Sequence, residues 1–285
     1  MAISASMVKD LRELTGAGMM ECKKALVETD GDMDAAVDVL RKQGLAAVSK
    51  KAGRDTNEGR VVAKVCDKGT CGTIVQVNCE TDFVAINEKF QAYCDRFANA
   101  ALASKATDVD TLKAAKDGDE TVEEILTDAI HVLGENTKIS YVNFHEADGV
   151  VSYIHGNGKI GVLVDFKLDG VDPTDDAFVA CGRDVAMHVA AMNPIATNRD
   201  SVDTEVVDHE MEIYKAQAAA SGKPEKIQEQ IATGRMNKFY KEQCLTEQAF
   251  VKDPDKTVQK YVEECAKAIG GKIEIASFER VALGE

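Results

Sequence analysis

The sequence lacks several features that would assign it to a particular class of protein. Its 285 residues include no Trp, and aromatic residues make up only 5% of the chain. No apolar run approaches the roughly 18 consecutive residues that a membrane-spanning helix needs. The first six residues, Met-Ala-Ile-Ser-Ala-Ser, match neither a secretory signal peptide nor an Arg-rich transit peptide. We therefore expect a cytoplasmic protein with no membrane partner.

Positive charge is also scarce. The chain has 34 Lys and Arg residues against 49 Asp and Glu residues, which gives a formal net charge of −15. Affinity for nucleic acid depends on Lys and Arg side chains that neutralise phosphates, so a polyanion repels a chain this acidic. We expect no direct contact with nucleic acid or with an anionic membrane surface. The local pair Lys23-Lys24 is interpreted as part of a solvated helix face.

Cysteine is present without the spacings that bind a metal. The eight cysteines contain no C-x-x-C motif, and no second pair at a fixed spacing completes a zinc site. Cys66 and Cys71 flank a short segment, Asp67-Lys68-Gly69-Thr70, that is typical of a hairpin turn. Scattered cysteines in a chain without a signal peptide indicate buried thiols in a reducing compartment. We expect no metal site.

The motifs of familiar enzymes are missing as well. None of H-E-x-x-H, G-x-S-x-G or G-x-x-x-x-G-K-[ST] occurs. His188 lies among small residues and is expected to be packed and hydrogen-bonded, whereas His155 precedes a glycine turn and is expected to be an exposed contact residue. The glycines between His155 and Lys159 link two strands, while a phosphate-binding loop opens a helix. The residues favour a binding protein without a cofactor over a thiol or metal enzyme.

Hydrophobic periodicity predicts an α+β fold that begins with a helical unit. Residues 4–43 have the apolar spacing of three short helices, separated at residues 15–18 and 30–32. About forty residues barely suffice for a separate core, so this unit is expected to dock on something else. Residues 42–58 are polar and are expected to form a linker that is helical in its first part.

Strands are predicted from about Arg60, where the apolar period changes from 3.6 residues to 2. The first set of expected elements comprises strands at 61–65 and 73–78, helices at 90–101 and 108–133, and a strand at 139–143. A second set follows the same plan: strands at 150–155 and 159–166, a helix at 175–192, a helix at 257–268 and a strand at 273–278. This repetition predicts an internal duplication of one α+β unit.

A helical hairpin is predicted inside the second set. Residues 202–220 and 226–240 have sparse apolar positions and are joined by Ser221-Gly222-Lys223-Pro224, so they should form two antiparallel helices that project from the body. The expected division of the chain is residues 1–54 for the helical unit, 55–140 for the first part of the core, 141–195 with 241–285 for the second part, and 196–240 for the hairpin.

One strand-to-helix corner stands out. The segment Glu80-Thr81-Asp82-Phe83-Val84 lies between the strand that ends near Cys79 and the helix expected from Phe90. Thr81 or Asp82 is a suitable N-cap for that helix. The apolar pair Phe83-Val84 either folds beneath the helix or projects towards a partner, and periodicity alone leaves both arrangements open.

Several segments resemble the elongation factor Ts family, in family order and over nearly the whole chain. They are residues 11–26 (LRELTGAGMMECKKAL), 77–84 (VNCETDFV), 133–136 (LGEN), 154–156 (IHG), 186–191 (AMHVAA) and 221–224 (SGKP). The family acts on elongation factor Tu, a GTPase. The resemblance implies an exchange factor that binds elongation factor Tu with GDP, displaces Mg²⁺ and promotes GDP release. The alternative is an adaptor, with a ubiquitin-associated-like unit, for an unrelated partner.

The resemblance also implies roles for individual residues. Phe83 would be an exposed wedge between two helices of the partner, and this contact would disturb Mg²⁺ and the phosphate loop. The residues implied in that action are Thr81, Asp82, Phe83 and Val84. The three-helix unit would be ubiquitin-associated-like and dock on the nucleotide-binding domain of the partner. The further contacts implied are Lys23, Leu133, Gly134, His155, Phe250 and Val251.

Two features depart from the family pattern. The family often has an apolar residue where Lys252 stands, which weakens the case for the Phe250-Val251 contact. Its members commonly continue beyond the position of Glu285 into a helix that grips the partner, so we expect a lower affinity for this chain. Family members differ in whether the core or the coiled coil pairs two copies, which implies a homodimer or a 2:2 complex as alternatives.

Overall fold

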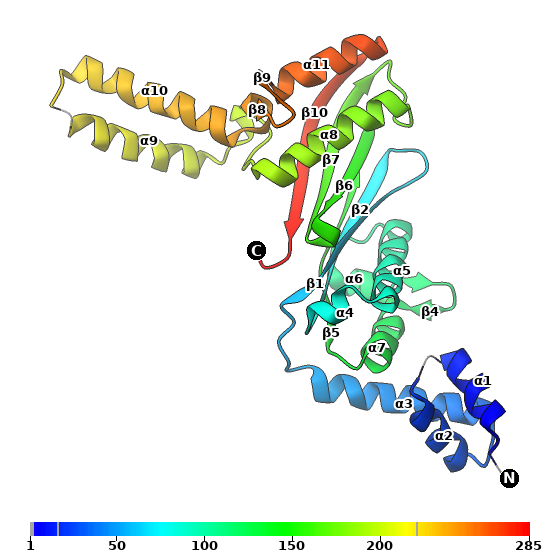
Figure 1. The fold of residues 1–285 in the computed structure, drawn as a ribbon. Coiled ribbons are helices and arrows are strands. Elements are labelled where there is room, and N and C mark those ends of the chain that lie inside the picture. Colours follow the sequence, from blue (N-terminus) through cyan, green and yellow to red (C-terminus); the bar gives the residue numbers. More distant parts are fainter. Residues whose placement is uncertain (1–2, 16, 221) are drawn as a thin grey trace.

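A helical unit, two sheet-containing units and a projecting helical hairpin make up the molecule (Figure 1). The structure, a computed structural model, describes residues 3–15, 17–220 and 222–285, without the side chains of residues 45–50. Gly16 and Ser221, both expected in turns, therefore lie outside the described residues. The mixture of helices and antiparallel strands confirms the predicted α+β class.

The N-terminal unit contains the predicted helices α1 (Ala5–Thr15), α2 (Met19–Glu28) and α3 (Met33–Lys51). Their apolar faces meet in a small core that includes Leu11, Cys22 and Leu26, all fully buried. Helix α3 extends to Lys51 and therefore includes the first part of the expected linker, residues 42–58, which was predicted to be helical. The Lys51 ammonium at its end donates a hydrogen bond to the Ile130 carbonyl (3.0 Å), which fastens this unit to the next.

The first sheet-containing unit is built on an antiparallel sheet with the strand order β1-β2-β5. Helix α5 covers the sheet because its apolar residues recur every three or four positions, and Phe90, Cys94 and Phe97 are fully buried. The elements of this unit are β1 (Glu58–Val65), β2 (Cys71–Cys79), α4 (Asp82–Ala85), α5 (Glu88–Ser104), α6 (Val109–Ala114), β3 (Lys116–Asp117), β4 (Glu120–Thr121), α7 (Val122–Leu133) and β5 (Thr137–Glu146).

Two expectations about the helices of this unit are wrong. The predicted helix over 108–133 is interrupted after α6, where Gly118 (φ +68°) permits a tight hairpin of β3 and β4 before α7. The long helix after the corner is not capped by Thr81 or Asp82. Its N-cap is Asn87, whose side chain accepts a hydrogen bond from the Lys89 amide (2.9 Å), because the chain first forms the separate short helix α4.

The second sheet-containing unit repeats this topology with the strand order β10-β7-β6. In each sheet the first two strands form a hairpin, and the second of them, β2 or β7, is the central strand. The third strand, β5 or β10, follows intervening helices and forms the other edge. This shared topology is what an internal duplication predicts. The elements are β6 (Gly149–His155), η1 (Gly156–Gly158), β7 (Ile160–Asp169), α8 (Asp176–Met192), η2 (Arg199–Ser201), α9 (Thr204–Ala219), α10 (Glu225–Gln243), η3 (Leu245–Glu247), β8 (Ala249–Phe250), β9 (Asp253–Thr257), α11 (Val258–Ile269) and β10 (Lys272–Ala282).

The two sheets pack against each other through a small apolar interface. Val61 and Ile74 of the first sheet meet Val150 and Leu163 of the second, and all four are buried. The sheets approach closely because Gly161 has no side chain: a Cβ atom there would lie 2.4 Å from Val61 Cγ1. The relative placement of the two units therefore depends on a glycine as well as on apolar contacts.

Helices α9 and α10 form the predicted hairpin and project away from the sheets (Figure 1). Most of their residues are exposed, but Ala218, Ala232 and Met236 are buried because the two helices cover each other. The hairpin is anchored at its base by a cluster that includes Ala196 and Cys244. Within the described ranges, none of the helices combines the length and the apolar character that a bilayer crossing requires.

Candidate partner-binding site

The Thr81–Val84 corner forms α4, a single turn of helix at the surface. The backbone of Thr81 is extended, and its Oγ1 accepts a hydrogen bond from the Val84 amide (3.4 Å), as an N-cap does. Asp82 is exposed at the first position of the turn. Val84 is half-buried against the first core, whereas Phe83 projects outward with 78% of its surface exposed. The expectation of an exposed Phe83 is confirmed, and its action as a wedge stays a prediction.

Ile86, which was not among the contact residues predicted from the sequence, extends this apolar surface. Its exposed fraction is 69%. Ile86 follows Phe83 by three positions, so the two side chains lie on the same side of the helical turn. Adjacent large apolar side chains that remain exposed are typical of an interaction site. The spacing of the two residues was the only signal for Ile86 in the sequence.

Two glutamates fasten the corner to the loop after α7. The Glu135 carboxylate accepts hydrogen bonds from the amides of Glu80 (3.1 Å) and Thr81 (3.0 Å) and from the Thr81 hydroxyl (2.6 Å). In return, the Glu80 carboxylate accepts a hydrogen bond from the Asn136 amide (2.6 Å). Hydrogen bonds to a carboxylate are stronger than those between neutral groups. The corner is therefore held by a part of the chain that is distant in sequence.

These bonds place two further predicted contacts beside the corner. Gly134 is exposed and ends α7 in the left-handed region (φ +78°), and Leu133 is half-buried against the first core. Arg54 joins the same network, since its guanidinium lies 3.3 Å from the Glu80 carboxylate. Its carbonyl accepts a hydrogen bond from the Asn136 side chain (2.9 Å). Nothing in the sequence indicated these hydrogen bonds and this ion pair, because they join residues of loops that are distant in sequence.

His155 is exposed, as expected, at the turn between β6 and β7. The turn packs on the start of β1, where the Lys159 ammonium lies 2.8 Å from the Glu58 carboxylate. In the strand register Glu58 is opposite Cys79, the residue before the corner segment. His155 and Phe83 therefore belong to the same end of the paired sheets.

The remaining predicted contacts lie elsewhere. Lys23 is exposed on α2 of the N-terminal unit, and Val251, 41% exposed, follows β8 at the base of the hairpin (Figure 1). Phe250 requires a correction. Its side chain is only 2% exposed and stacks on the Tyr261 ring, with centroids 4.2 Å apart, so it is part of the core and offers no surface to a partner.

His188 supports the turn that carries Val251. As expected, it is buried and hydrogen-bonded: its Nε2 lies 2.9 Å from Gln248 Oε1, and its Nδ1 accepts a hydrogen bond from the Val251 amide (3.1 Å). Burial lowers the pKa of His188, which favours the neutral ring that this pair of bonds requires. The histidine is a structural residue rather than a catalytic base.

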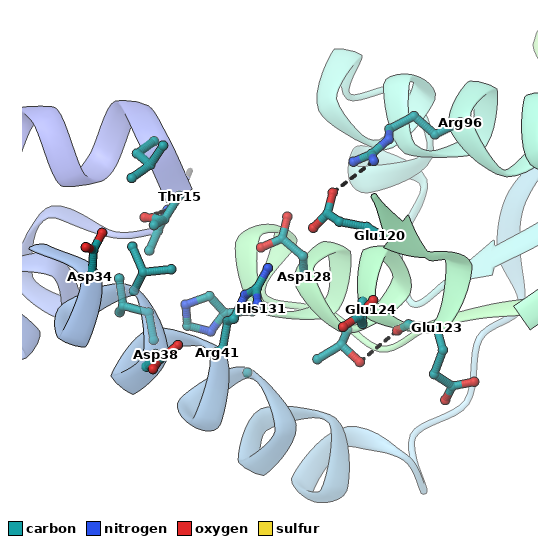
Figure 2. A pocket seen from close by; sticks show the side chains of 16 residues that line it. Thr15, Asp34, Asp38, Arg41, Arg96, Glu120, Glu123, Glu124, Asp128 and His131 are labelled. Atoms are coloured by element: carbon teal, nitrogen blue, oxygen red, sulfur yellow. Dashed lines mark hydrogen bonds and ion pairs between the residues drawn. The ribbon is translucent and has the colours of Figure 1, made fainter. Parts of the chain in front are cut away.

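A cavity of about 800 Å³ lies between the N-terminal unit and α7, and none of the predicted contact residues lines it (Figure 2). Its lining is strongly charged and includes acidic side chains such as Asp34 and Asp128 and the basic side chains of Arg41, Arg96 and His131. Small-molecule sites are mostly apolar with a few convergent polar groups, and this groove is not of that kind. Among the residues that the structure describes, no cluster of His, Cys, Asp and Glu side chains is suited to a metal ion.

The fold and the site are those of a protein with an exposed apolar surface of the kind that macromolecular partners bind. A family model described as Elongation factor TS matches residues 80–285. The chain is 50% identical over 289 residues to elongation factor Ts of Syntrophotalea carbinolica, covering 100% of this chain and 94% of that relative. It is 48% identical over 291 residues to elongation factor Ts of Trichlorobacter lovleyi, with the same coverage.

A third relative, elongation factor Ts of Clostridium botulinum strain Alaska E43, is 48% identical over 286 residues, covering 99% of this chain and 93% of the relative. The chain therefore belongs to the elongation factor Ts family, and its role is that of a translation elongation factor.

Proposed function

We propose that the chain is the guanine nucleotide exchange factor for elongation factor Tu, and that it acts on the GDP-bound partner by displacing Mg²⁺. The observation that carries this proposal is the 78% exposure of Phe83 on a turn held at both ends. Membership of the elongation factor Ts family supports the choice of partner. The exchange step moves no covalent bond, so the chain needs neither a catalytic residue nor a cofactor.

The physics of nucleotide binding explains how a wedge releases GDP. A GTPase holds the nucleotide through backbone N–H groups of its phosphate loop and through Mg²⁺ that bridges phosphate oxygens. An aromatic side chain inserted between two helices of the partner shifts the loop and the metal together. Loss of the metal removes a large positive charge beside the phosphates of GDP. A distorted phosphate loop no longer directs its backbone N–H groups at those phosphates. GDP then dissociates.

Thermodynamic linkage determines how much binding free energy the Phe83 contact must supply. A factor that weakens GDP binding by a given ratio is itself weakened by GDP in the same ratio. A coupling free energy of about 4 kcal/mol corresponds to a change in affinity of roughly 10³-fold. Complete burial of one Phe side chain supplies about 1.5–3 kcal/mol. Phe83 therefore accounts for a large part of the coupling, and neighbouring contacts supply the rest.

Phe83 can displace helices of the partner only if the turn that carries it, α4, keeps its own position. Val84 seats α4 in the core, Thr81 caps it, and Glu135 ties both the cap and the preceding residue to the end of α7. Because these contacts exist before binding, little of the binding free energy is lost in ordering the corner. Asp82 lies beside the wedge and would contact the same region of the partner.

The other predicted contacts extend this interface. Leu133, Gly134 and His155 lie at the same end of the sheets as the corner and would widen the contact, with His155 on the partner's third domain. Lys23 would dock the N-terminal unit on the nucleotide-binding domain. Val251 would make a separate contact near the hairpin. Burial of Phe250 assigns that residue to supporting Val251.

We also infer the domain division and setting of the protein. The helical unit would span residues 1–54, the core 55–140 and then 141–195 with 241–285, and the hairpin 196–240. Its location would be the cytoplasm, which fits a role in translation elongation. The chain would form a homodimer or a 2:2 complex with elongation factor Tu, and the mass in solution of the chain alone and of the complex distinguishes these alternatives.

The decisive experiment measures release of a fluorescent GDP analogue from elongation factor Tu with catalytic amounts of the chain. We expect Phe83→Ala to slow stimulated release roughly 10- to 100-fold, which is the burial free energy of the side chain converted to a rate ratio. Met192→Ala is the matched control, because Met192 is a large apolar residue that is 48% exposed at the end of α8, in the second sheet-containing unit. Circular dichroism should show both variants folded.

Chelation of Mg²⁺ tests the metal step separately. If the wedge acts through the metal, an excess of EDTA should narrow the difference between the parent chain and Phe83→Ala, because the step that Phe83 promotes has already occurred. Equal release rates for Phe83→Ala and Met192→Ala in Mg²⁺ would remove Phe83 from the mechanism. Stable binding to elongation factor Tu without any effect on release would reject exchange and retain the partner.

A further inference from the structure

Cys66 and Cys71 face each other at the tip of the β1–β2 hairpin. The register pairs Val65 with Gly72, so the next pair towards the turn is Cys66 with Cys71, and the Cys66 amide donates to the Cys71 carbonyl (2.9 Å). Residues opposite each other in an antiparallel pair carry their side chains on one face, with Cα atoms about 5.5 Å apart when hydrogen-bonded. Disulfides bridge Cα separations of about 4.4–6.8 Å. The two thiols are therefore placed to form a bond.

The hairpin tip is fixed on both sides of this pair. Gly69 donates its amide to the Cys66 carbonyl (2.8 Å) and accepts a hydrogen bond from the Val150 amide (2.7 Å). The Thr70 carbonyl accepts a hydrogen bond from the Ala147 amide (3.0 Å). These bonds join the tip to the connection between β5 and β6. The two cysteines are thus held opposite each other in a turn that is fixed by hydrogen bonds to a neighbouring segment.

The surroundings of the two thiols differ. Cys66 Sγ accepts a hydrogen bond from the Cys71 amide (3.2 Å) and lies 3.9 Å from Thr70 Oγ1. Burial alone would raise the pKa of Cys66, but these hydrogen bonds outweigh it and lower the pKa to about 7. Burial and the neighbouring Cys66 sulfur raise the pKa of Cys71 to about 11. Cys66 therefore ionises near neutral pH, whereas Cys71 stays protonated there.

The pair is also accessible. Cys66 and Cys71 are only partly buried, which corrects the expectation that all eight cysteines are buried. Cys79 and Cys94, by contrast, are fully buried, and burial raises the pKa of the Cys79 thiol to about 12. A small oxidant would reach the hairpin tip and meet a thiolate there, whereas Cys79 and Cys94 are neither reachable nor ionised.

We propose that Cys66 and Cys71 are a redox-active dithiol that a peroxide oxidises to an intramolecular disulfide. The Cys66 thiolate attacks one peroxide oxygen and the O–O bond breaks, which leaves Cys66 as a sulfenic acid. The departing oxygen takes up the proton that Cys66 released and becomes water. Cys71 then attacks the Cys66 sulfur, the S–O bond breaks, and the hydroxyl leaves with the Cys71 proton as a second water. Two thiols are oxidised and one hydrogen peroxide is reduced.

The test treats the 285-residue chain with a small excess of hydrogen peroxide near pH 7.5, followed by alkylation, digestion and mass mapping. We expect a Cys66–Cys71 disulfide to form before any change at Cys79 or Cys94, with loss of two hydrogen atoms and reversal by dithiothreitol. A non-reducing gel should show monomer, because the bond is within one chain. A product without the Cys66–Cys71 link, or with a link only between chains, would overturn the proposal.

Two hairpin variants separate the roles of the thiols. Cys71→Ser should leave a Cys66 sulfenic acid that dimedone traps, and Cys66→Ser should leave Cys71 unmodified. We expect the peroxide reaction at Cys66 in the first variant to be about 10-fold or more faster than at Cys71 in the second, since the thiolate is the reacting form. Equal rates would contradict the asymmetry. Circular dichroism checks that both variants fold, and the outcome does not depend on the exchange activity.

Discussion

His145 contacts two carboxylates. We predict that the free energy of unfolding falls as the pH rises from 6.5 to about 9, and that replacing His145 abolishes this part of the pH dependence. His145 on β5 lies 2.8 Å from the Asp165 carboxylate on β7 and 2.8 Å from the Glu279 carboxylate on β10. The three side chains are 12%, 10% and 17% exposed. Ser277 donates a further hydrogen bond to Asp165, and Tyr141 donates one to Glu279. The cluster joins the first sheet to the second.

The magnitude follows from the pKa of His145. Burial would lower this pKa, but the hydrogen bonds and negative charges of Asp165 and Glu279 outweigh burial and raise it from 6.5 to about 9. The native state therefore binds the proton more tightly than the unfolded state. The stabilisation is fully present below pH 6.5 and is lost as the pH rises to 9. At 1.36 kcal/mol per unit of pKa, it amounts to about 3 kcal/mol.

Urea unfolding between pH 6 and 9 measures this effect. Far-ultraviolet circular dichroism is the suitable signal, because the chain contains no Trp. The variant His145→Gln keeps a polar side chain but cannot carry the charge. We expect its free energy of unfolding to lie about 3 kcal/mol below that of the parent chain at pH 6.5, with the difference shrinking towards pH 9. Titrating groups that do not contact His145 affect both proteins and cancel in the difference, whereas Asp165 and Glu279 lose their cationic partner in the variant.

Direct titration of His145 by NMR provides a second measurement if the variant folds poorly. The ring proton shifts should report a pKa near 9 in the parent chain. The reasoning fails if the free energies of the two proteins run parallel over this pH range, or if His145 titrates near its ordinary value of 6.5.

Three other predictions concern stability, and urea unfolding checks each. Phe90→Ala should cost about 3–5 kcal/mol because Phe90 is fully buried, whereas Phe83→Ala should change stability by less than about 0.5 kcal/mol; similar costs would contradict the assignment of one to the core and the other to the surface. Gly161→Ala should cost about 1–3 kcal/mol because its Cβ would lie 2.4 Å from a facing side chain, and Gly53→Ala, with no atom within 4 Å, is the control. Thr121→Ala should cost about 0.5–2 kcal/mol because the hydroxyl caps α7, and an unchanged midpoint would show that the cap is dispensable.

Local sequence patterns predicted most of the elements. The spacing of Phe90, Cys94 and Phe97 predicted α5 because a helix face recurs every 3.6 residues, and each of the three is buried as that pattern requires. The alternation around Val75 and Val77 likewise predicted β2. The interruption between α6 and α7 was missed because Gly118 is an isolated glycine in an otherwise helical pattern.

Tertiary structure decided what each aromatic residue of the predicted site does. Phe83 and Phe250 both stand in short apolar segments, yet Phe83 is 78% exposed and Phe250 is 2% exposed. Phe250 belongs to the second core and is stacked by Tyr261, while no comparable ring covers Phe83 among the ring contacts of the described residues. Such neighbours are distant in sequence, so periodicity carries no information about them.

The corner owes its rigidity to the same kind of contact. The sequence by itself indicated a helix start at Thr81 or Asp82 and the apolar pair that follows, since each depends on residues within a few positions, but it did not indicate that α4 is separate from α5. Only the folded chain brings Glu135 to the amides of Glu80 and Thr81. Side-chain hydrogen bonds between distant loops depend on where the loops meet, and that is set by the packing of the whole unit.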